Sequence, residues 1–181
     1  MFWFTADYHL SHENIMKYCH RPFSSVKQMD DMILSNLDAS IRPGDTLYFL
    51  GDLSFGLEGA KRTLSIVKDR KTNLIFIKGN HDKSQVLAFL KSNSIPIMAL
   101  TTIYLADHPV ILCHYSMRVW DRSHFNSYQL YAHSHGTLPP EGKHHDCGVD
   151  ANDFFPVSGT SIIKIMESRP DNFNYIQNRG R

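Results

Sequence analysis

The chain has 181 residues, a length typical of one domain, and 42% of them are hydrophobic, which is ordinary for a globular protein. Nineteen Lys and Arg residues balance 18 Asp and Glu residues, so the formal net charge is only +1. This composition excludes wholesale disorder, and it argues against a protein that holds nucleic acid mainly by neutralising many phosphates.

Short apolar runs that end in polar residues predict buried strands. In chain order they cover residues 2–6, 46–50, 74–77, 110–113 and 130–132. Apolar residues at helical spacing predict helices over residues 26–41, 57–67, 84–90 and 160–167. Strands alternate with helices in the first ninety residues, which predicts an α/β fold with a largely parallel sheet. The closer spacing of strands after about Ile97 predicts a more antiparallel second half.

We predict a single domain over residues 1–168 and a polar C-terminal tail over residues 169–181, which we expect to be frayed. The N-terminus reaches Asp7 too early for the apolar region of a signal peptide. No stretch approaches the roughly 20 apolar residues that span a bilayer. The sequence therefore predicts a cytoplasmic protein without a membrane partner. Three cysteines at irregular spacing indicate neither a disulfide framework nor a Cys-based zinc site.

Side chains that can bind metal ions follow five of the predicted strands. They are Asp7 and His9, Asp52, Asn80 and His81, His114, and His133 and His135. Ligands of open α/β sheets bind beyond the carboxyl ends of the strands. Asp-x-His and His-x-His spacing places both side chains of a pair on one side of an extended chain, so each pair could hold one ion. A single His of this kind could be a core residue, but the whole series predicts a shared site.

In this order the residues resemble the calcineurin-like metallophosphoesterase superfamily, whose pattern is D-x-H, GD, GNH(D/E), a single His and GHxH. The chain matches each block from Asp7 to His135, with Ala132 where the family usually has glycine. Flanking segments such as HENIMKYCHRPFSS and GVDANDFFPVS resemble the small bacterial and phage branch. The resemblance implies a four-layer αββα sandwich of two mixed sheets flanked by helices, with metals at one edge.

The resemblance also implies two divalent metal ions. Asp7, His9, Asp52 and His135 would hold the first ion, and Asp52 would bridge to a second ion held by Asn80, His114 and His133. Mixed imidazole, carboxylate and carboxamide ligands favour Mn, Fe, Zn, Ni or Co over Mg or Ca. They do not select one ion among these.

The expected function is a metal-dependent phosphoesterase, a hydrolase in which a hydroxide bridging the two ions attacks phosphorus. His81, next to Asn80, is the candidate general acid for the leaving oxygen. The protein-phosphatase branch orients this acid with an Asp three residues after the GD aspartate, where this chain has Phe55. His12, Arg21 and Arg118 are weaker candidates for substrate contacts, because Arg suits a bidentate grip on phosphate oxygens.

A phosphodiester substrate is favoured, such as a nucleotide or a nucleic-acid end, because the short chain has no long insertion to form a lid. A phosphomonoesterase and a nuclease of the same fold are the alternatives. A non-catalytic metal-binding scaffold is a further alternative, against which the complete ligand set argues. The chain has no GxSxG elbow and no GxGxxG after its first strand, so an α/β hydrolase or a Rossmann dehydrogenase lacks support. The oligomeric state stays open.

Overall fold

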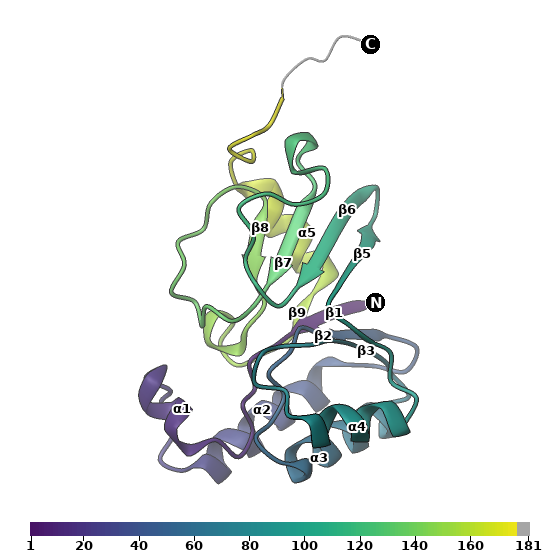
Figure 1. Cartoon of the computed structure of the whole chain (residues 1–181), viewed down its shortest axis with the longest axis vertical. Helices are drawn as coiled ribbons and strands as arrows, with labels where there is room; N and C mark the ends of the chain where they lie inside the picture. The colour runs from purple at the N-terminus through teal and green to yellow at the C-terminus, as the bar shows by residue number, and fades with distance from the viewer. Residues whose placement is uncertain (177–181) are drawn as a thin grey trace.

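The computed structural model describes residues 1–176 and has an α/β fold with two mixed sheets and flanking helices (Figure 1). The first sheet has the strand order β4-β3-β2-β1-β9, and the second has the order β5-β6-β7-β8. The first sheet consists of β1 (Phe2–Thr5), β2 (Thr46–Phe49), β3 (Asn73–Ile77), β4 (Ile97–Met98) and β9 (Val157–Ser158). The second consists of β5 (Leu100–Leu105), β6 (His108–Cys113), β7 (Tyr128–Tyr131) and β8 (His144–Asp146).

Strand direction agrees with the sequence in the first sheet and differs from it in the second. Strands β1 to β4 are parallel, and β9 pairs antiparallel with β1. In the second sheet β5 and β6 are antiparallel, but β6, β7 and β8 are parallel to one another. The prediction of a more antiparallel second half is therefore wrong for the pairing of β6 with β7 and of β7 with β8, whereas β5 and β9 pair antiparallel with their neighbours. Residues 114–127 and 132–143 are long enough to return the chain to the same end of the sheet, which parallel pairing requires.

Helices form where the apolar spacing predicts them, and Ser25 and Ser158 cap two of them by accepting a backbone N–H from Gln28 and Ser161. The predicted helices are α2 (Val26–Ser40), α3 (Leu57–Asp69), α4 (Ser84–Ser92) and α5 (Gly159–Ser168). The additional helices are α1 (Glu13–Tyr18) and two 3₁₀ turns, η1 (Ser123–Phe125) and η2 (Val149–Ala151). Within residues 1–176, no helix has the length and the apolar character needed to cross a membrane.

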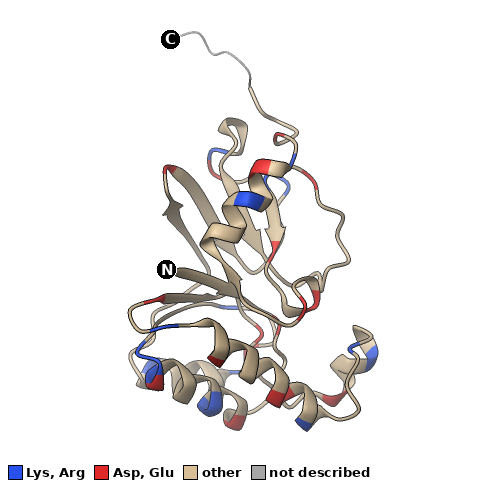
Figure 2. Cartoon of the chain, turned by 180° about the vertical axis from the view of Figure 1, so that it is seen from behind, with Lys and Arg blue, Asp and Glu red and all other residues tan. Residues whose placement is uncertain are grey.

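Two apolar cores hold the layers together. Helices α2, α3 and α4 cover one face of the first sheet, where Leu47 and Phe49 are buried. The opposite face, with Tyr48, packs against Leu130 of the second sheet and Ile162 of α5. Because side chains alternate along a strand, one strand serves both cores. Figure 2 shows charges of both signs along the helical layer, as expected for a solvated face.

The segment after α5 packs against the domain. The side chain of Asn172 is 4% exposed; it accepts the backbone N–H of Lys143 and donates to the carbonyl oxygens of Ser123 and Ser127. Buried polar groups with several partners hold a chain in place. The expected fraying is therefore wrong at this position, and residues 177–181 of the predicted tail lie outside the described residues.

Candidate metal centre

The carboxyl ends of strands from both sheets bring the seven predicted metal ligands together. We call this set the ligand cluster; it consists of Asp7, His9, Asp52, Asn80, His114, His133 and His135. Its donor atoms form two groups, in each of which the atoms lie within 4.8 Å of one another: Asp7, His9 and His135, and Asp52, His114 and His133. Asn80 joins the second group through its Oδ1, which lies 3.0 Å from Nε2 of His114. The division matches the two ions that the resemblance implies.

The backbone of the ligand cluster is strained. Five of its members have positive φ angles: Asp7 (56°), His9 (48°), Asp52 (59°), His133 (68°) and His135 (49°). This region is uncommon for residues other than glycine, and such strain gathers at functional sites where the surrounding structure holds it. Ala132, which replaces the family glycine, is not among the residues with positive φ. The substitution therefore adds no backbone strain.

Two glycines allow the ends of β2 and β3 to meet. A Cβ on Gly51, whose φ is +97°, would lie 2.5 Å from the backbone nitrogen of Gly79, and a Cβ on Gly79 would collide with the Asp52 carboxylate. Asp82 fixes this junction, because its carboxylate accepts the N–H groups of Gly79, Asp52 and Leu53 at 2.7, 3.0 and 3.0 Å. The sequence placed Asp82 within the GNHD motif but did not reveal this role.

Buried donor atoms of the ligand cluster lack partners. Oδ2 of Asp7 accepts the N–H of His133 at 2.8 Å, and Oδ1 of Asp52 accepts the N–H of His81 at 2.8 Å. Among the described residues, Oδ1 of Asp7, Oδ2 of Asp52 and Nε2 of His9 are buried without a hydrogen-bond partner. Unpaired buried acceptors are rare and costly. These atoms therefore fit a cation-binding site.

The environment of His114 points to the same conclusion. Its Nδ1 lies 2.6 Å from the carbonyl oxygen of Leu50, so Nδ1 carries the hydrogen of that bond. Nε2 faces two oxygens, Oδ1 of Asn80 at 3.0 Å and Oδ2 of Asp52 at 3.5 Å. Burial lowers the pKa of His114, but the nearby carboxylate of Asp52, together with the charge of Asp7, raises it overall. The lone pairs of His114 Nε2, Asn80 Oδ1 and Asp52 Oδ2 therefore point toward one another. Because lone pairs repel, either a proton or a metal ion is required between these atoms.

Burial shifts the pKa values of two members of the ligand cluster, Asp7 and His9. It raises the pKa of Asp7 to about 7 and lowers the pKa of His9 to about 3. His9 is therefore neutral at physiological pH, which is the form that binds metal ions.

A carboxylate that sequence reasoning missed orients His135. Nδ1 of His135 lies 2.7 Å from Oδ2 of Asp150, which leaves Nε2 for a metal ion. Burial lowers the pKa of His135, but the hydrogen bonds with Asp150 and Cys19 raise it to about 10. Carboxylates commonly orient metal-binding histidines in this way. Asp150 lies in the GVDANDFFPVS segment, which carried only the resemblance in the sequence.

Arg21 supports this carboxylate from a buried position. Its buried guanidinium binds both oxygens of Asp150, at 2.7 and 2.8 Å, and donates to the carbonyl oxygens of Asp7 and Tyr8. Its remaining N–H faces the sulfur of Met29. The predicted substrate contact has no support in the geometry, because all five N–H groups already have partners.

A pocket of about 350 Å³ lies over the ligand cluster, and His12 and His81 line it. The His12 ring stacks on Phe55 with 3.9 Å between centroids, and Phe55 lies 6.4 Å from the His81 ring. Within the described part of the chain, the His81 ring has no hydrogen-bonded partner to orient it. Aromatic contacts with Phe55 and His9 surround it instead.

Arg118 is not brought to this pocket. Its guanidinium carbon lies 4.7 Å from the centroid of the Phe173 ring, and it lines a different pocket. A contact between Arg118 and a phosphate at the ligand cluster therefore has no support in the geometry.

Comparison with known proteins finds relatives of similar length. No family model matches the chain. The chain is 29% identical over 170 residues to the uncharacterized protein MJ1445 of Methanocaldococcus jannaschii, a match that covers 90% of this chain and 89% of that protein. It is 32% identical over 81 residues to the Gene 66 protein of Mycobacterium phage L5, covering 44% of this chain and 39% of that protein. The crystal structure of the protein of unknown function AQ665 from Aquifex aeolicus matches with a TM-score of 0.70 and 27% identity, covering 91% of this chain and 98% of that chain.

Proposed function

We propose that the protein is a phosphoesterase that depends on two divalent transition-metal ions and prefers phosphodiesters. One observation carries this proposal: two groups of donor atoms lie next to each other, and each contains a buried carboxylate oxygen that has no hydrogen-bond partner among the described residues. The order of the ligands along the chain, which resembles the calcineurin-like metallophosphoesterase superfamily, supports it. The four-layer αββα sandwich of that superfamily is part of the same proposal.

The ligand cluster would hold the ions as its two groups suggest. The first ion would be bound by Asp7, His9, Asp52 and His135, and the second by Asp52, Asn80, His114 and His133. When bound, two divalent ions supply the positive charge that activates water and stabilises the developing charge on phosphoryl oxygens. Imidazole, carboxylate and amide donors suit Mn, Fe, Zn, Ni or Co.

His81 would donate the proton to the leaving oxygen. Its side chain is exposed and lines the pocket over the ligand cluster, with its ring centroid 5.5 Å from that of His9. Its backbone N–H holds Oδ1 of Asp52, so the backbone and the side chain serve different purposes. His12, in the same pocket, would contact the substrate.

The substrate preference follows from access to the site. His81 and His133 are exposed at the pocket, and no long insertion of this chain is available to close over them. An open site admits a phosphorus atom that carries two substituents. A nucleotide or a nucleic-acid end would be a substrate of this kind.

Hydrolysis assays with defined metals test the proposal. Chelated protein would be reloaded separately with Mn, Ni, Co, Zn or Mg and given bis-p-nitrophenyl phosphate or p-nitrophenyl phosphate. We expect diester turnover that needs a transition metal and is lost in Asp52→Asn. Asp69→Asn, an exposed Asp at the end of α3, is the matched control and should keep activity. A preference for the monoester would assign a phosphatase instead.

Metal binding would be measured separately from turnover. Two ions per chain are expected by elemental analysis, and a free ion concentration 100 times the Kd of one site should add about 2.7 kcal/mol to the free energy of unfolding. Two bound ions with no hydrolysis of either ester would contradict the enzymatic proposal and favour a metal-binding scaffold.

A further inference from the structure

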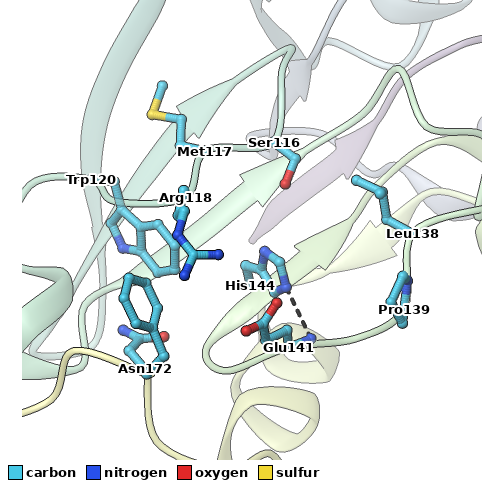
Figure 3. Close-up of a pocket in the computed structure, with 10 residues that line it drawn as sticks. Ser116, Met117, Arg118, Trp120, Leu138, Pro139, Glu141, His144 and Asn172 are labelled. Atoms are coloured by element: carbon cyan, nitrogen blue, oxygen red, sulfur yellow. Dashed lines mark hydrogen bonds between the residues drawn. The ribbon is translucent and has the colours of Figure 1, made fainter.

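A second pocket, of about 310 Å³, is not used by the chemistry proposed above (Figure 3). We call it the aromatic pocket. It is lined by aromatic rings and by one group of each charge, namely Arg118, Trp120, Glu141, His144 and Phe173. Figure 3 shows Arg118 and Trp120 on one side of His144, Leu138 and Pro139 on the other, and Glu141 below it. A half-enclosed space with apolar walls and a few polar groups is typical of a small-molecule site.

The aromatic pocket adjoins the metal centre, because two segments of chain contribute to both. After β6, His114 belongs to the ligand cluster and Ser116 lines the aromatic pocket. After β7, Thr137 lines the pocket over the ligand cluster and Leu138 lines the aromatic pocket. A chain spans at most about 3.6 Å per residue, so these lining residues are close neighbours in space. The two pockets are therefore neighbours, separated by these two segments of chain.

Hydrogen bonds hold one wall of the aromatic pocket in place. The fully buried side chain of Gln129 donates to the carbonyl oxygen of Tyr115 at 2.9 Å and accepts the N–H of Met117 at 3.0 Å. The indole Nε1 of Trp120 donates to the carbonyl oxygen of Ser127 at 3.1 Å. The wall is therefore formed without a ligand, which reduces the ordering cost of binding.

His144 leaves a polar atom unpaired at this pocket. The residue is 8% exposed, and its ring is nearly parallel to that of Trp120, with 6.0 Å between centroids and 11° between planes. Nε2 accepts the backbone N–H of Glu141 at 3.0 Å, which places the hydrogen of a neutral ring on Nδ1. Among residues 1–176, Nδ1 has no hydrogen-bond partner. Buried polar atoms are normally satisfied, so a bound polar molecule would complete this site.

The remaining groups define the chemistry of the ligand. Phe173 is 54% exposed and Arg118 lies over its ring, so both can contact a ligand. Aromatic faces favour a planar ring, Arg118 donates hydrogen bonds, and Glu141 accepts them. A simple anion would be repelled by Glu141, and a purely apolar group would leave both charges unpaired. A purine or pyrimidine base has a planar face, acceptors and donors together.

We propose that the aromatic pocket binds the nucleobase of a nucleotide whose phosphoester lies at the ligand cluster. This inference rests on the proposed function for the position of the phosphoester. It narrows the substrate class to nucleoside phosphoesters. Binding of the base itself requires no hydrolysis, so the two proposals can fail separately.

Base binding would be measured first by fluorescence. Trp3 and Trp120 are the two tryptophans of the chain, so a Trp3→Phe variant reports on Trp120 alone. Thymidine 5′-monophosphate, added to the full chain with and without reloaded metal, should quench this fluorescence to saturation. Ribose 5-phosphate, which lacks the base, should not. Equal responses to both compounds, or no response to either, would overturn the inference.

Kinetics with matched esters give a second test. Thymidine 5′-(p-nitrophenyl phosphate) and methyl p-nitrophenyl phosphate share a leaving group and differ in the second substituent, which is a nucleoside in the first and a methyl group in the other. Phe173→Leu should lower the ratio of kcat/KM for the thymidine ester to that for the methyl ester by about tenfold, since aromatic stacking on a base is lost. Its exposed position makes misfolding a small concern. Tyr104→Leu removes an exposed aromatic of β5 outside the pocket and should preserve the ratio.

The outcomes separate the two proposals. If Phe173→Leu leaves the ratio unchanged, the inference of a base pocket is wrong while the phosphoesterase stands. If the wild-type protein hydrolyses neither ester, the proposed function fails, and the fluorescence titration decides whether a base binds.

Discussion

The two sheets contribute different ligands to the cluster and hold them by different means. Loops after the first sheet supply the carboxylates Asp7 and Asp52, each held by a backbone N–H on one oxygen. Loops after the second sheet supply His114, His133 and His135. A backbone N–H remains when a side chain is changed, so the carboxylates are fixed by the fold itself.

Two histidines from the second sheet, His114 and His135, are held instead by contacts of their ring nitrogen Nδ1. Nδ1 of His114 contacts the carbonyl oxygen of Leu50, whereas Nδ1 of His135 contacts the side chain of Asp150. A substitution of Asp150, which lies outside the ligand cluster, can therefore weaken metal binding by the donor group that contains His135. This contrast predicts which changes remove turnover, which remove a metal ion, and which alter stability alone.

The largest effect is expected for His81→Ala, which removes the side chain of His81 and leaves its backbone in place. His81→Ala keeps the N–H that holds Asp52, so both ions should remain bound. Loss of the proton donor should lower kcat for the diester by about 10² to 10⁴-fold. Steady-state kinetics and metal content would be measured together, with His108→Ala, an exposed His on β6, as the control. Wild-type kcat in His81→Ala would remove the catalytic assignment, and loss of an ion would show that the side chain binds metal.

A smaller effect is expected at the donor group that contains Asp7, His9 and His135. Asp150→Asn removes the negative charge behind His135 and leaves Arg21 without its ion pair. Loss of a partner that orients a metal ligand typically weakens metal binding about 10 to 100-fold. Calorimetric titration should show this weakening at one ion while the other keeps its affinity. Asp153→Asn, exposed and nearby, is the control. Equal weakening of both ions, or of neither, would contradict the division of the ligand cluster into two donor groups.

The smallest effect is on the stability of the metal-free protein as a function of pH. The folded-state pKa of His135 is raised to about 10, above its ordinary value of 6.5, so the folded protein keeps a proton that the unfolded chain loses. The free energy of unfolding should fall between pH 7 and 9.5, by about 1–3 kcal/mol. Below pH 6.5 the raised pKa of Asp7 and the lowered pKa of His9 act in opposite directions, so little slope is expected there.

Denaturant unfolding of chelated protein would measure this dependence. Asp150→Asn should flatten the decline above pH 7, because the hydrogen bond that raises the pKa of His135 is weakened. An unchanged slope in that variant would assign the proton to another group.

The sequence was sufficient for the positions of the first strands and for the side chains that gather at their carboxyl ends. Short apolar runs that end in Asp7, Asp52 or Asn80 carry both signals locally, because burial and metal-binding chemistry are properties of residue type. Parallel strands then place their carboxyl ends at one edge. The side chains at those ends could therefore be assigned to one site without knowledge of the packing.

Only the tertiary structure showed which residues support the side chains of the ligand cluster. Arg21 and Asp150 are 129 residues apart, and nothing in the local pattern of either indicates the other. An Arg in a loop suggests phosphate binding until the fold surrounds it with acceptors. The parallel direction of β6, β7 and β8 likewise depends on how long connections return across the sheet. Residue types specify which chemistry is available, whereas the pairing of distant groups depends on packing that forms only when the whole chain folds.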